Sequence, residues 1–244
     1  MATYFISDLH LQADRPAMTH GFLHWLDHLQ DADQLYILGD FFEVWVGDDY
    51  SDPMVQSIEA GLKSLSQRDC DIFIMHGNRD FLIGEALCQR CGANLLDEYS
   101  TLTLGKTTAL LLHGDSLCTA DQGYMNMRQL FRNPAWQASI LAKSLDERIA
   151  FSRTIRSESQ QSMGEKSMEI MDVTPAEVDK ALDEAGVSLM IHGHTHRPAT
   201  HQWQDANGEQ RQRIVLGDWS DQQGWYIRWQ EGSLPELIQF DLHT

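Results

Sequence analysis

The stretch Tyr4-Phe5-Ile6-Ser7-Asp8-Leu9-His10 decides how this chain folds, because a short apolar run passes directly into aspartate and histidine. Short apolar runs of this kind are typical of buried strands. Four later runs end in the same way, in the motifs Gly39-Asp40, Gly77-Asn78-Arg79-Asp80, His113-Gly114-Asp115 and Gly193-His194-Thr195-His196. Side chains at the ends of parallel strands can meet at one edge of a sheet, so we expect the five motifs to form one site.

The length and composition indicate one large domain, or one domain with an insertion. The 244 residues are 42% hydrophobic, enough for a substantial core, and contain no apolar run long enough to span a membrane. The first residues enter a strand without a basic region or a cleavage signature, so we expect a cytoplasmic protein. Cys88-x-x-Cys91 is either half of a zinc ribbon or, because no second pair follows, two ordinary thiols.

The charge is strongly negative overall but uneven along the chain. A net charge of −18 argues against a nucleic-acid partner, which would require a basic face. Residues 121–166 contain seven Lys or Arg and five Asp or Glu, a net charge of +2 that leaves −20 for the remainder. A basic segment on an acidic body suits an anionic membrane surface, and a solvated charged face is the alternative.

The first 115 residues predict strands and helices in alternation. We expect strands at 3–7, 34–38 and 71–75 and helices near 16–30, 52–67 and 81–91. This rhythm indicates a largely parallel sheet covered by helices. Residues 100–112 then predict a hairpin around Gly105-Lys106.

Residues 121–170 interrupt the alternation and predict two or more inserted helices. Apolar side chains recur there at roughly helical spacing: Met125, Leu130, Phe131, Trp136, Ile140, Leu141 and Leu145. A helix capped by Thr174, a strand at 188–192 and a strand-rich tail from 198 to 242 follow. We therefore expect a core formed by 1–120 and 171–244, with 121–170 as a helical lid.

The five motifs offer carboxylate, amide and imidazole groups, a donor set that suits Mn²⁺, Fe or Zn²⁺ with open positions for water. Cysteine is absent from all five, which disfavours a closed structural zinc site. Each motif alone has a structural alternative, such as a helix cap or a tight turn. Their joint occurrence at five strand ends favours a catalytic metal site.

In order and chemistry the motifs resemble those of the calcineurin-like metallophosphoesterases. The resemblance implies an α/β fold, namely a metallophosphoesterase-type β-sandwich flanked by helices, and two metal sites. The implied ligands are Asp8, His10, Asp40 and His196 for one metal and Asp40, Asn78, His113 and His194 for the other. Asp40 would be the bridge, and a bridging carboxylate can hold two cations about 3.5–4 Å apart for a phosphoryl displacement.

One position departs from the family pattern. Many relatives have a histidine that assists the leaving group at the position of Arg79 in this chain. An arginine offers bidentate contacts to a phosphate instead. We therefore expect the catalytic residues to be Asp40, Asn78, Arg79 and His113, with Arg79 stabilising charge on the phosphoryl oxygens.

The residues around the motifs narrow the resemblance. They are 40–49, 76–82, 113–119, 166–173 and 192–198. Over essentially the whole chain they are similar to the UDP-2,3-diacylglucosamine diphosphatases of lipid A biosynthesis. That family attacks the α-phosphorus of UDP-2,3-diacylglucosamine and releases UMP and 2,3-diacylglucosamine 1-phosphate. The resemblance implies a hydrolase with two Mn²⁺ ions per chain, acting as a monomer on the cytoplasmic face of the inner membrane.

The resemblance also implies a set of substrate contacts. They would be Asn78, Arg79, Asp121, Ser159, Lys166 and His194. The family often has asparagine four residues after the serine, where this chain has Met163, so that contact is lost or replaced. The apolar stripe of 121–170 would form a groove for acyl chains, or it packs the insertion onto the core.

Other interpretations of the sequence stay open. The chain could be a broad metal-dependent phosphodiesterase or phosphatase on soluble substrates. It could also be a non-catalytic scaffold, although all seven ligand positions are intact. The histidines at positions 20, 24 and 28 could form a metal-binding stripe, but without a carboxylate motif around them a plain surface is the better interpretation.

Overall fold

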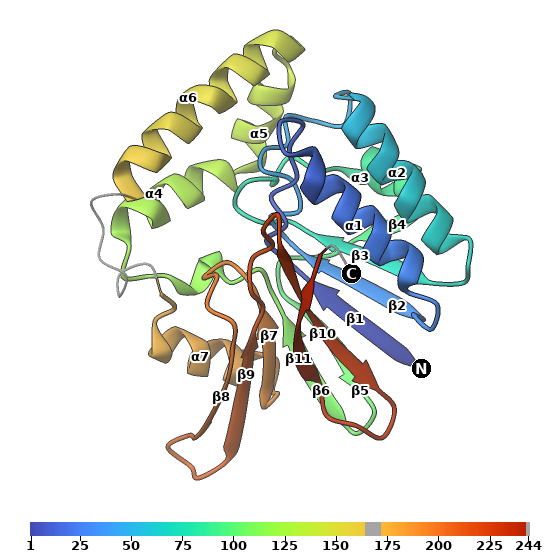
Figure 1. Ribbon diagram of the computed structural model, residues 1–244. Coiled ribbons are helices and arrows are strands. Elements are labelled where there is room, and N and C mark those ends of the chain that lie inside the picture. The colour runs from blue at the N-terminus through green and yellow to red at the C-terminus, as the bar shows by residue number, and fades with distance from the viewer. Residues whose placement is uncertain (164–171, 243–244) are drawn as a thin grey trace.

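Two β-sheets packed face to face form the centre of the computed structural model, and helices cover both outer faces (Figure 1). The structure describes residues 1–163 and 172–242, without side chains between 157 and 163. The first sheet has the order β11 (Glu236–Asp241), β10 (Gln223–Gln230), β1 (Ala2–Ile6), β2 (Gln34–Leu38), β3 (Asp71–Met75) and β4 (Ala93–Leu95). The second has the order β5 (Ser100–Leu104), β6 (Thr107–Leu111), β7 (Leu189–His192), β9 (Gln210–Val215) and β8 (Ala199–Gln204).

The alternating side chains of β1 face two different cores, because successive residues of a strand point to opposite faces of the sheet. Tyr4 and Ile6 pack against the helices on the outer face of the first sheet, which are α1 (Pro16–His28), α2 (Pro53–Ser66) and α3 (Glu85–Cys91). Phe5 instead packs between the sheets, with Leu111 of β6 and Ile191 of β7. A third cluster joins the second sheet to α7 (Pro175–Ala185). The predicted β-sandwich flanked by helices is therefore confirmed.

The strand pairing shows that the predicted parallel sheet is only part of the fold, because antiparallel strands and a second sheet are also present. Strands β1 to β4 are parallel, as expected, and β10 joins β1 in antiparallel orientation. The predicted hairpin forms as β5 and β6, but β6 pairs with β7 and begins a second sheet. Apolar side chains on both faces of β6 fit this position, because Leu111 faces the first sheet and Leu110 faces α7.

The predicted helix at 81–91 begins only at Glu85. A helix cap is the structural alternative for the motif Asn78-Arg79-Asp80, but the carboxylate of Asp80 accepts the N–H groups of Phe41 (2.8 Å) and Gly77 (2.7 Å). Asp48 takes over the capping role, since its carboxylate accepts the N–H groups of Gly84 and Leu87, both at 2.9 Å. Asp80 therefore organises the motif loops rather than the helix.

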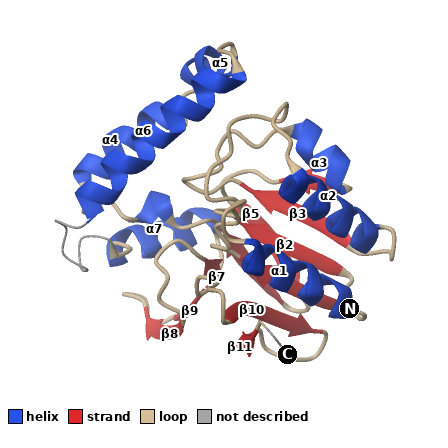
Figure 2. Cartoon of the chain, turned by 45° about the horizontal axis from the view of Figure 1, so that its top comes forward, coloured by secondary structure: helices blue, strands red, loops and turns tan. Residues whose placement is uncertain are grey.

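The segment predicted to be helical forms α4 (Gln122–Phe131), α5 (Pro134–Leu141) and α6 (Leu145–Met163). These helices form a group set off from the two sheets (Figures 1 and 2). α4 has no buried residue, and α5 buries only Ile140. Within the described part of the chain, none of the helices combines the length and the apolar character needed to span a membrane.

Candidate metal centre

The five motifs lie in loops at the carboxyl ends of five strands, and both sheets contribute. Asp8 follows β1, Asp40 follows β2 and Asn78 follows β3 in the first sheet. His113 follows β6, and the two histidines of the last motif follow β7 in the second sheet. The structure brings all seven predicted ligands together at one end of the sandwich, through the contacts described below.

The backbone at this rim is unusual. The predicted ligands with positive φ are Asp8 (58°), His10 (50°), Asp40 (49°), His194 (68°) and His196 (54°). Among the non-glycine residues that the structure describes, Asp69 in a surface turn is the one other case. Left-handed backbone costs about 1–3 kcal/mol per residue and collects at functional sites. The loops therefore aim these side chains inward at the expense of stability.

Two glycines in the motifs are required by close approach. A Cβ at Gly77 would lie 2.1 Å from the backbone nitrogen of Asp40. A Cβ at Gly193 would lie 2.2 Å from Oγ of Ser7 and 2.3 Å from Oδ2 of Asp8. Any side chain at either position would displace a neighbouring ligand loop.

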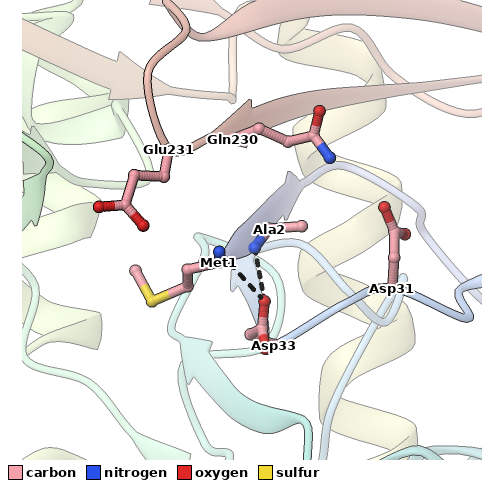
Figure 3. A pocket seen from close by; sticks show the side chains of 6 residues that line it. All are labelled: Met1, Ala2, Asp31, Asp33, Gln230 and Glu231. Carbon is pink, nitrogen blue, oxygen red and sulfur yellow. Dashed lines mark hydrogen bonds and ion pairs between the residues drawn. The ribbon is translucent and has the colours of Figure 1, made fainter.

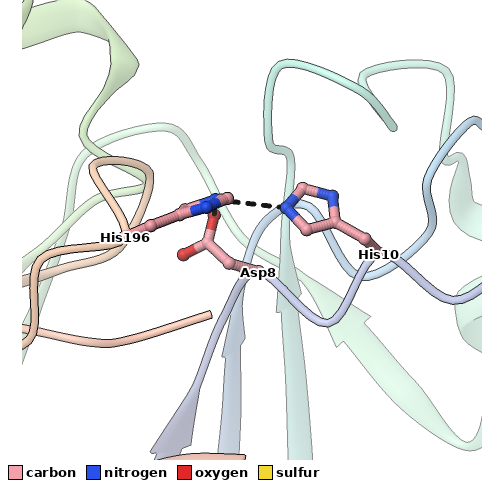
Figure 4. A group of neighbouring side chains, drawn as sticks. All are labelled: Asp8, His10 and His196. Atoms are coloured by element: carbon pink, nitrogen blue, oxygen red, sulfur yellow. Dashed lines mark hydrogen bonds and ion pairs between the residues drawn. The ribbon is translucent and has the colours of Figure 1, made fainter. Parts of the chain in front are cut away.

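Asp8, His10 and His196 form a first cluster, in which one potential ligand atom from each residue lies within 4.8 Å of the others (Figure 4). Nε2 of His10 is 3.2 Å from Nε2 of His196, which in turn is 3.4 Å from Oδ1 of Asp8. Oδ2 of Asp8 accepts from Oγ of Ser7 and from the N–H of His194. Oδ1 is buried and has no hydrogen-bond partner, so it is available to a cation.

A second cluster contains Asp8, Asp40 and His113, again with ligand atoms within 4.8 Å of one another. Asn78 completes it, because its Oδ1 lies 3.0 Å from Nε2 of His113 and 2.8 Å from Nδ1 of His194. Asp8 is the residue common to both clusters.

Asp40 nevertheless faces both groups. Its Oδ2 is 3.9 Å from Nδ1 of His10, and its Oδ1 is 3.6 Å from Nε2 of His113. Its predicted role as the bridging ligand stays a prediction, and this position between the clusters is compatible with it.

The charges of the rim favour a bound cation. Burial lowers the pKa of His10 to about 3 and that of His194 to about 4, so both imidazoles are neutral and can bind a metal. Burial, together with the charges of Asp80 and Asp8, raises the pKa of Asp40 to about 7. Burial lowers the pKa of His196, but the neighbouring carboxylate of Asp8 outweighs burial and raises it to about 9. Positive charge placed among these carboxylates relieves their repulsion.

The donor set therefore fits a divalent metal. It combines carboxylates, an amide oxygen and imidazoles, without cysteine. The buried oxygen of Asp8 that lacks a hydrogen bond provides the structural evidence that an additional ligand belongs here.

Arg79 lies at the edge of the second cluster. Its backbone N–H donates to Oδ1 of Asp40 at 2.9 Å, and its Nε is 3.5 Å from Oδ2 of the same carboxylate. Its guanidinium also donates to Oε1 of Glu43. The arginine is thus held beside the metal cluster with part of its donors directed at protein carboxylates.

Several residues at the rim were not assigned a role by the sequence. Tyr124 of α4 donates to Oδ2 of Asp115 at 2.6 Å, and its ring centroid lies 6.0 Å from that of His194. Arg128 also donates to Asp115, at 2.9 Å, and Arg132 donates to the carbonyl of Gly77 at 3.0 Å. The sequence shows polar residues in the loops that contain Gly77 and Asp115. It does not indicate that side chains of α4 bind these loops.

The predicted substrate contacts beyond the rim are only partly described. Asp121 is the N-cap of α4, where its carboxylate accepts the N–H of Tyr124 at 3.0 Å. The side chain of Ser159, that of Met163 and the whole of Lys166 lie outside the described residues.

Other candidate features carry no metal-site geometry. The rings of His24 and His28 contact each other at a tilt, with centroids 4.2 Å apart, on the exposed face of α1, away from both described clusters. The four cysteines are buried free thiols, so Cys88 and Cys91 are ordinary core residues. A surface pocket of about 380 Å³, lined in part by Asp31, Asp33 and Glu231, lies at the amino end of β1, opposite the rim (Figure 3).

Comparisons with known proteins point to the same chemistry. The sequence model of the calcineurin-like phosphoesterase family matches residues 1–198. A UDP-2,3-diacylglucosamine hydrolase from Chromohalobacter salexigens is 47% identical over 98% of each chain. Another, from Cellvibrio japonicus, is 50% identical over 93% of this chain and 94% of its own. A solved phosphoesterase from E. coli aligns at 16% identity over 93% of this chain and 87% of that one, with a TM-score of 0.44, too low to add to the sequence matches.

Proposed function

Because the chain belongs to the calcineurin-like phosphoesterases, and among them to the UDP-2,3-diacylglucosamine hydrolases, we propose that its rim hydrolyses the pyrophosphate of UDP-2,3-diacylglucosamine. Water attacks the α-phosphorus, and the products are UMP and 2,3-diacylglucosamine 1-phosphate, a step of lipid A biosynthesis. The observation that carries the proposal is the pair of adjoining metal-ligand clusters on five strand-end loops.

Within this proposal two Mn²⁺ ions are the cofactors. Asp8, His10, Asp40 and His196 hold one, and Asp40, Asn78, His113 and His194 hold the other. When bound, such cations lower the pKa of a water molecule and offset charge on the phosphoryl oxygens. The neutral imidazoles of His10 and His194 and the buried, unpaired Oδ1 of Asp8 support this ligand assignment.

The protein side chains have complementary roles. The guanidinium of Arg79 contributes donors beside Asp40, where charge develops on the phosphoryl oxygens. Asn78 and His194 hold one another through a 2.8 Å contact and border the same space. Asp121, Ser159 and Lys166 contact the glucosamine and phosphate region. The chain has Arg79 where many relatives have a histidine. This residue therefore stabilises charge and does not donate a proton.

The helical group α4 to α6 serves as the lid that binds the acyl chains, with 1–120 and 171–244 as the core. Large apolar side chains of α4 and α5 are exposed: Met127, Leu130 and Leu141. A contiguous exposed apolar patch can mark the place where an apolar ligand binds. Together with the net charge of +2 between 121 and 166, it supports an enzyme that works on the anionic cytoplasmic face of the inner membrane, and we propose that it does so as a monomer.

The test is a hydrolysis assay in H₂¹⁸O with Mn²⁺ and UDP-2,3-diacylglucosamine. We expect UMP to be released with the label in UMP, because attack at the α-phosphorus leaves the new oxygen there. Equal turnover of a de-acylated UDP-sugar would favour the broad phosphodiesterase instead. Absence of UMP release by protein that has bound Mn²⁺ would favour the non-catalytic scaffold.

A further inference from the structure

Glu43 is a buried carboxylate beside the first metal cluster. Its backbone N–H donates to the carbonyl of Leu11 at 3.1 Å, and Phe42 forms a parallel bridge with Leu11. These contacts fix Glu43 next to the loop that carries His10. Only 7% of the residue is exposed, and a carboxylate buried this far requires charged partners or N–H donors.

Glu43 has such partners in three different segments of the chain. Oε1 accepts from the guanidinium of Arg79 and lies 2.7 Å from Nη1 of Arg156 in α6. Oε2 lies 3.4 Å from Nδ1 of His10. One side chain thus touches a proposed metal ligand, the arginine beside Asp40, and the helical lid.

The orientation of the His10 ring gives this contact its meaning. Nε2 of His10 faces His196, and Nδ1 points away from it (Figure 4). Nδ1 is buried without a hydrogen bond, and of the two carboxylates near it Glu43, at 3.4 Å, is closer than Asp40, at 3.9 Å. A histidine that binds a metal usually donates its other N–H to a carboxylate, which fixes the tautomer and the ring orientation.

We infer that Glu43 is a positioning residue that couples the metal cluster to Arg79. It accepts the Nδ1–H of His10, which directs the Nε2 lone pair toward Asp8 and His196. Through its other oxygen it holds the guanidinium of Arg79 beside Asp40. The inference rests on the proposed function, because it requires that this cluster binds a cation and that Arg79 meets a phosphate.

The substitution Glu43→Gln tests both contacts, since it keeps the shape and one acceptor oxygen but removes the charge. Glu59→Gln is the matched control, because Glu59 accepts from Arg90 at 2.8 Å between α2 and α3, outside the rim. On the full chain we expect Glu43→Gln to bind Mn²⁺ about 10-fold more weakly, as measured by EPR titration. At saturating Mn²⁺ we expect kcat to fall about 10-fold with a smaller change in KM. The control should match the wild type in both measurements.

A folded Glu43→Gln protein with unchanged Mn²⁺ affinity and unchanged kcat overturns the inference. If thermal unfolding shows that this variant does not fold, Glu43→Asp takes its place, because it withdraws the carboxylate by one methylene. The same criteria then apply to Glu43→Asp. A wild type that binds Mn²⁺ but releases no UMP contradicts the proposed substrate, and the Mn²⁺ affinities of the variants then still decide the role of Glu43. A wild type that binds no Mn²⁺ overturns both proposals.

Discussion

The rim of strand-end loops and the helices α4 to α6 are built in opposite ways. At the rim, ligands such as Asp8 and Asp40 are buried, lie on left-handed backbone and touch glycines that leave no room for a methyl group. In α4 and α5, Ile140 is the one buried residue, and the helices are attached through polar contacts such as that of Tyr124 with Asp115 and through stacking of Phe131 on Phe81. The side chains of the metal clusters are therefore fixed by their surroundings, whereas α4 and α5 leave apolar side chains exposed, as the proposed lid requires.

The largest effect should come from removing one charge at the rim. Asp40→Asn tolerates the left-handed backbone, because asparagine adopts it readily, but it removes the carboxylate between the two clusters. We expect UMP release to fall by at least about 10³-fold. Asp69→Asn is the matched control, an aspartate with the same positive φ in a surface turn, and should keep full activity. Comparable activity in the two variants would mean that Asp40 is not a ligand.

The next largest effect should come from adding one methyl group, which should lower stability at the rim but not in α4. In Gly193→Ala the new Cβ would collide with Ser7 and Asp8, and we expect a loss of stability of about 3 kcal/mol and weaker Mn²⁺ binding. In Gly123→Ala, within α4, the nearest neighbour is Asp121 at 3.6 Å, an ordinary contact. That variant should gain about 0.5 kcal/mol. Thermal unfolding measures both, and equal melting temperatures would contradict the rigid rim.

A smaller effect is expected from the exposed apolar surface of the lid. Leu130 is 48% exposed, so Leu130→Gln should change stability by less than about 0.5 kcal/mol. If the side chain contacts an acyl chain, kcat/KM for UDP-2,3-diacylglucosamine should fall about 10-fold. This factor corresponds to the free energy of burying part of a leucine side chain. Leu234→Gln, at a 77% exposed position in the turn between β10 and β11, should leave kcat/KM unchanged. An equal loss for a de-acylated substrate would argue that the stripe only packs the lid.

The smallest effect concerns the ion pair between α6 and the loop that follows β2. Arg148 of α6 donates to both carboxylate oxygens of Asp49, and this hydrogen bonding lowers the pKa of Asp49. A carboxyl with a lowered folded-state pKa stabilises the fold above its unfolded pKa of about 3.9, and loses that contribution as the pH falls through the folded value.

Asp49 is 61% exposed, so water screens the pair and the stabilisation should be below about 1 kcal/mol. The difference in melting temperature between wild type and Asp49→Asn should be constant from pH 7 to about pH 5. It should shrink as the pH falls below the unfolded pKa of about 3.9 and vanish once the pH lies below the folded-state pKa. A difference that grows toward acid pH would contradict this assignment.

Much of the fold follows from local pattern, and the misses have non-local causes. Strand β3 and helix α7 occupy the predicted residues, because apolar runs and a Thr-Pro start are local signals. β4 was missed, since Ala93-Asn94-Leu95 is too short to show a period and pairs only through β3. The second sheet depends on the pairing of β6 with β7, nearly 80 residues later in the chain, and no local pattern reports that.

The site shows the same division. All seven predicted ligands meet because residue type and position at a strand end are visible in the sequence. Glu43 and Asp80 were missed, because their partners are set by loop conformation. The left-handed φ of five ligands could not be predicted either, because aspartate and histidine do not indicate this conformation as strongly as glycine does.

The order of the ligands along the chain has a consequence for biosynthesis. Asp8 belongs to the first strand, whereas its partner His196 comes almost 190 residues later, beyond the whole lid. During synthesis from the amino terminus, Asp8, Asp40 and His113 can assemble first, and the cluster with His10 cannot close until β7 has paired with β6. Occupancy of that cluster by a cation would therefore report that β7 has joined the second sheet.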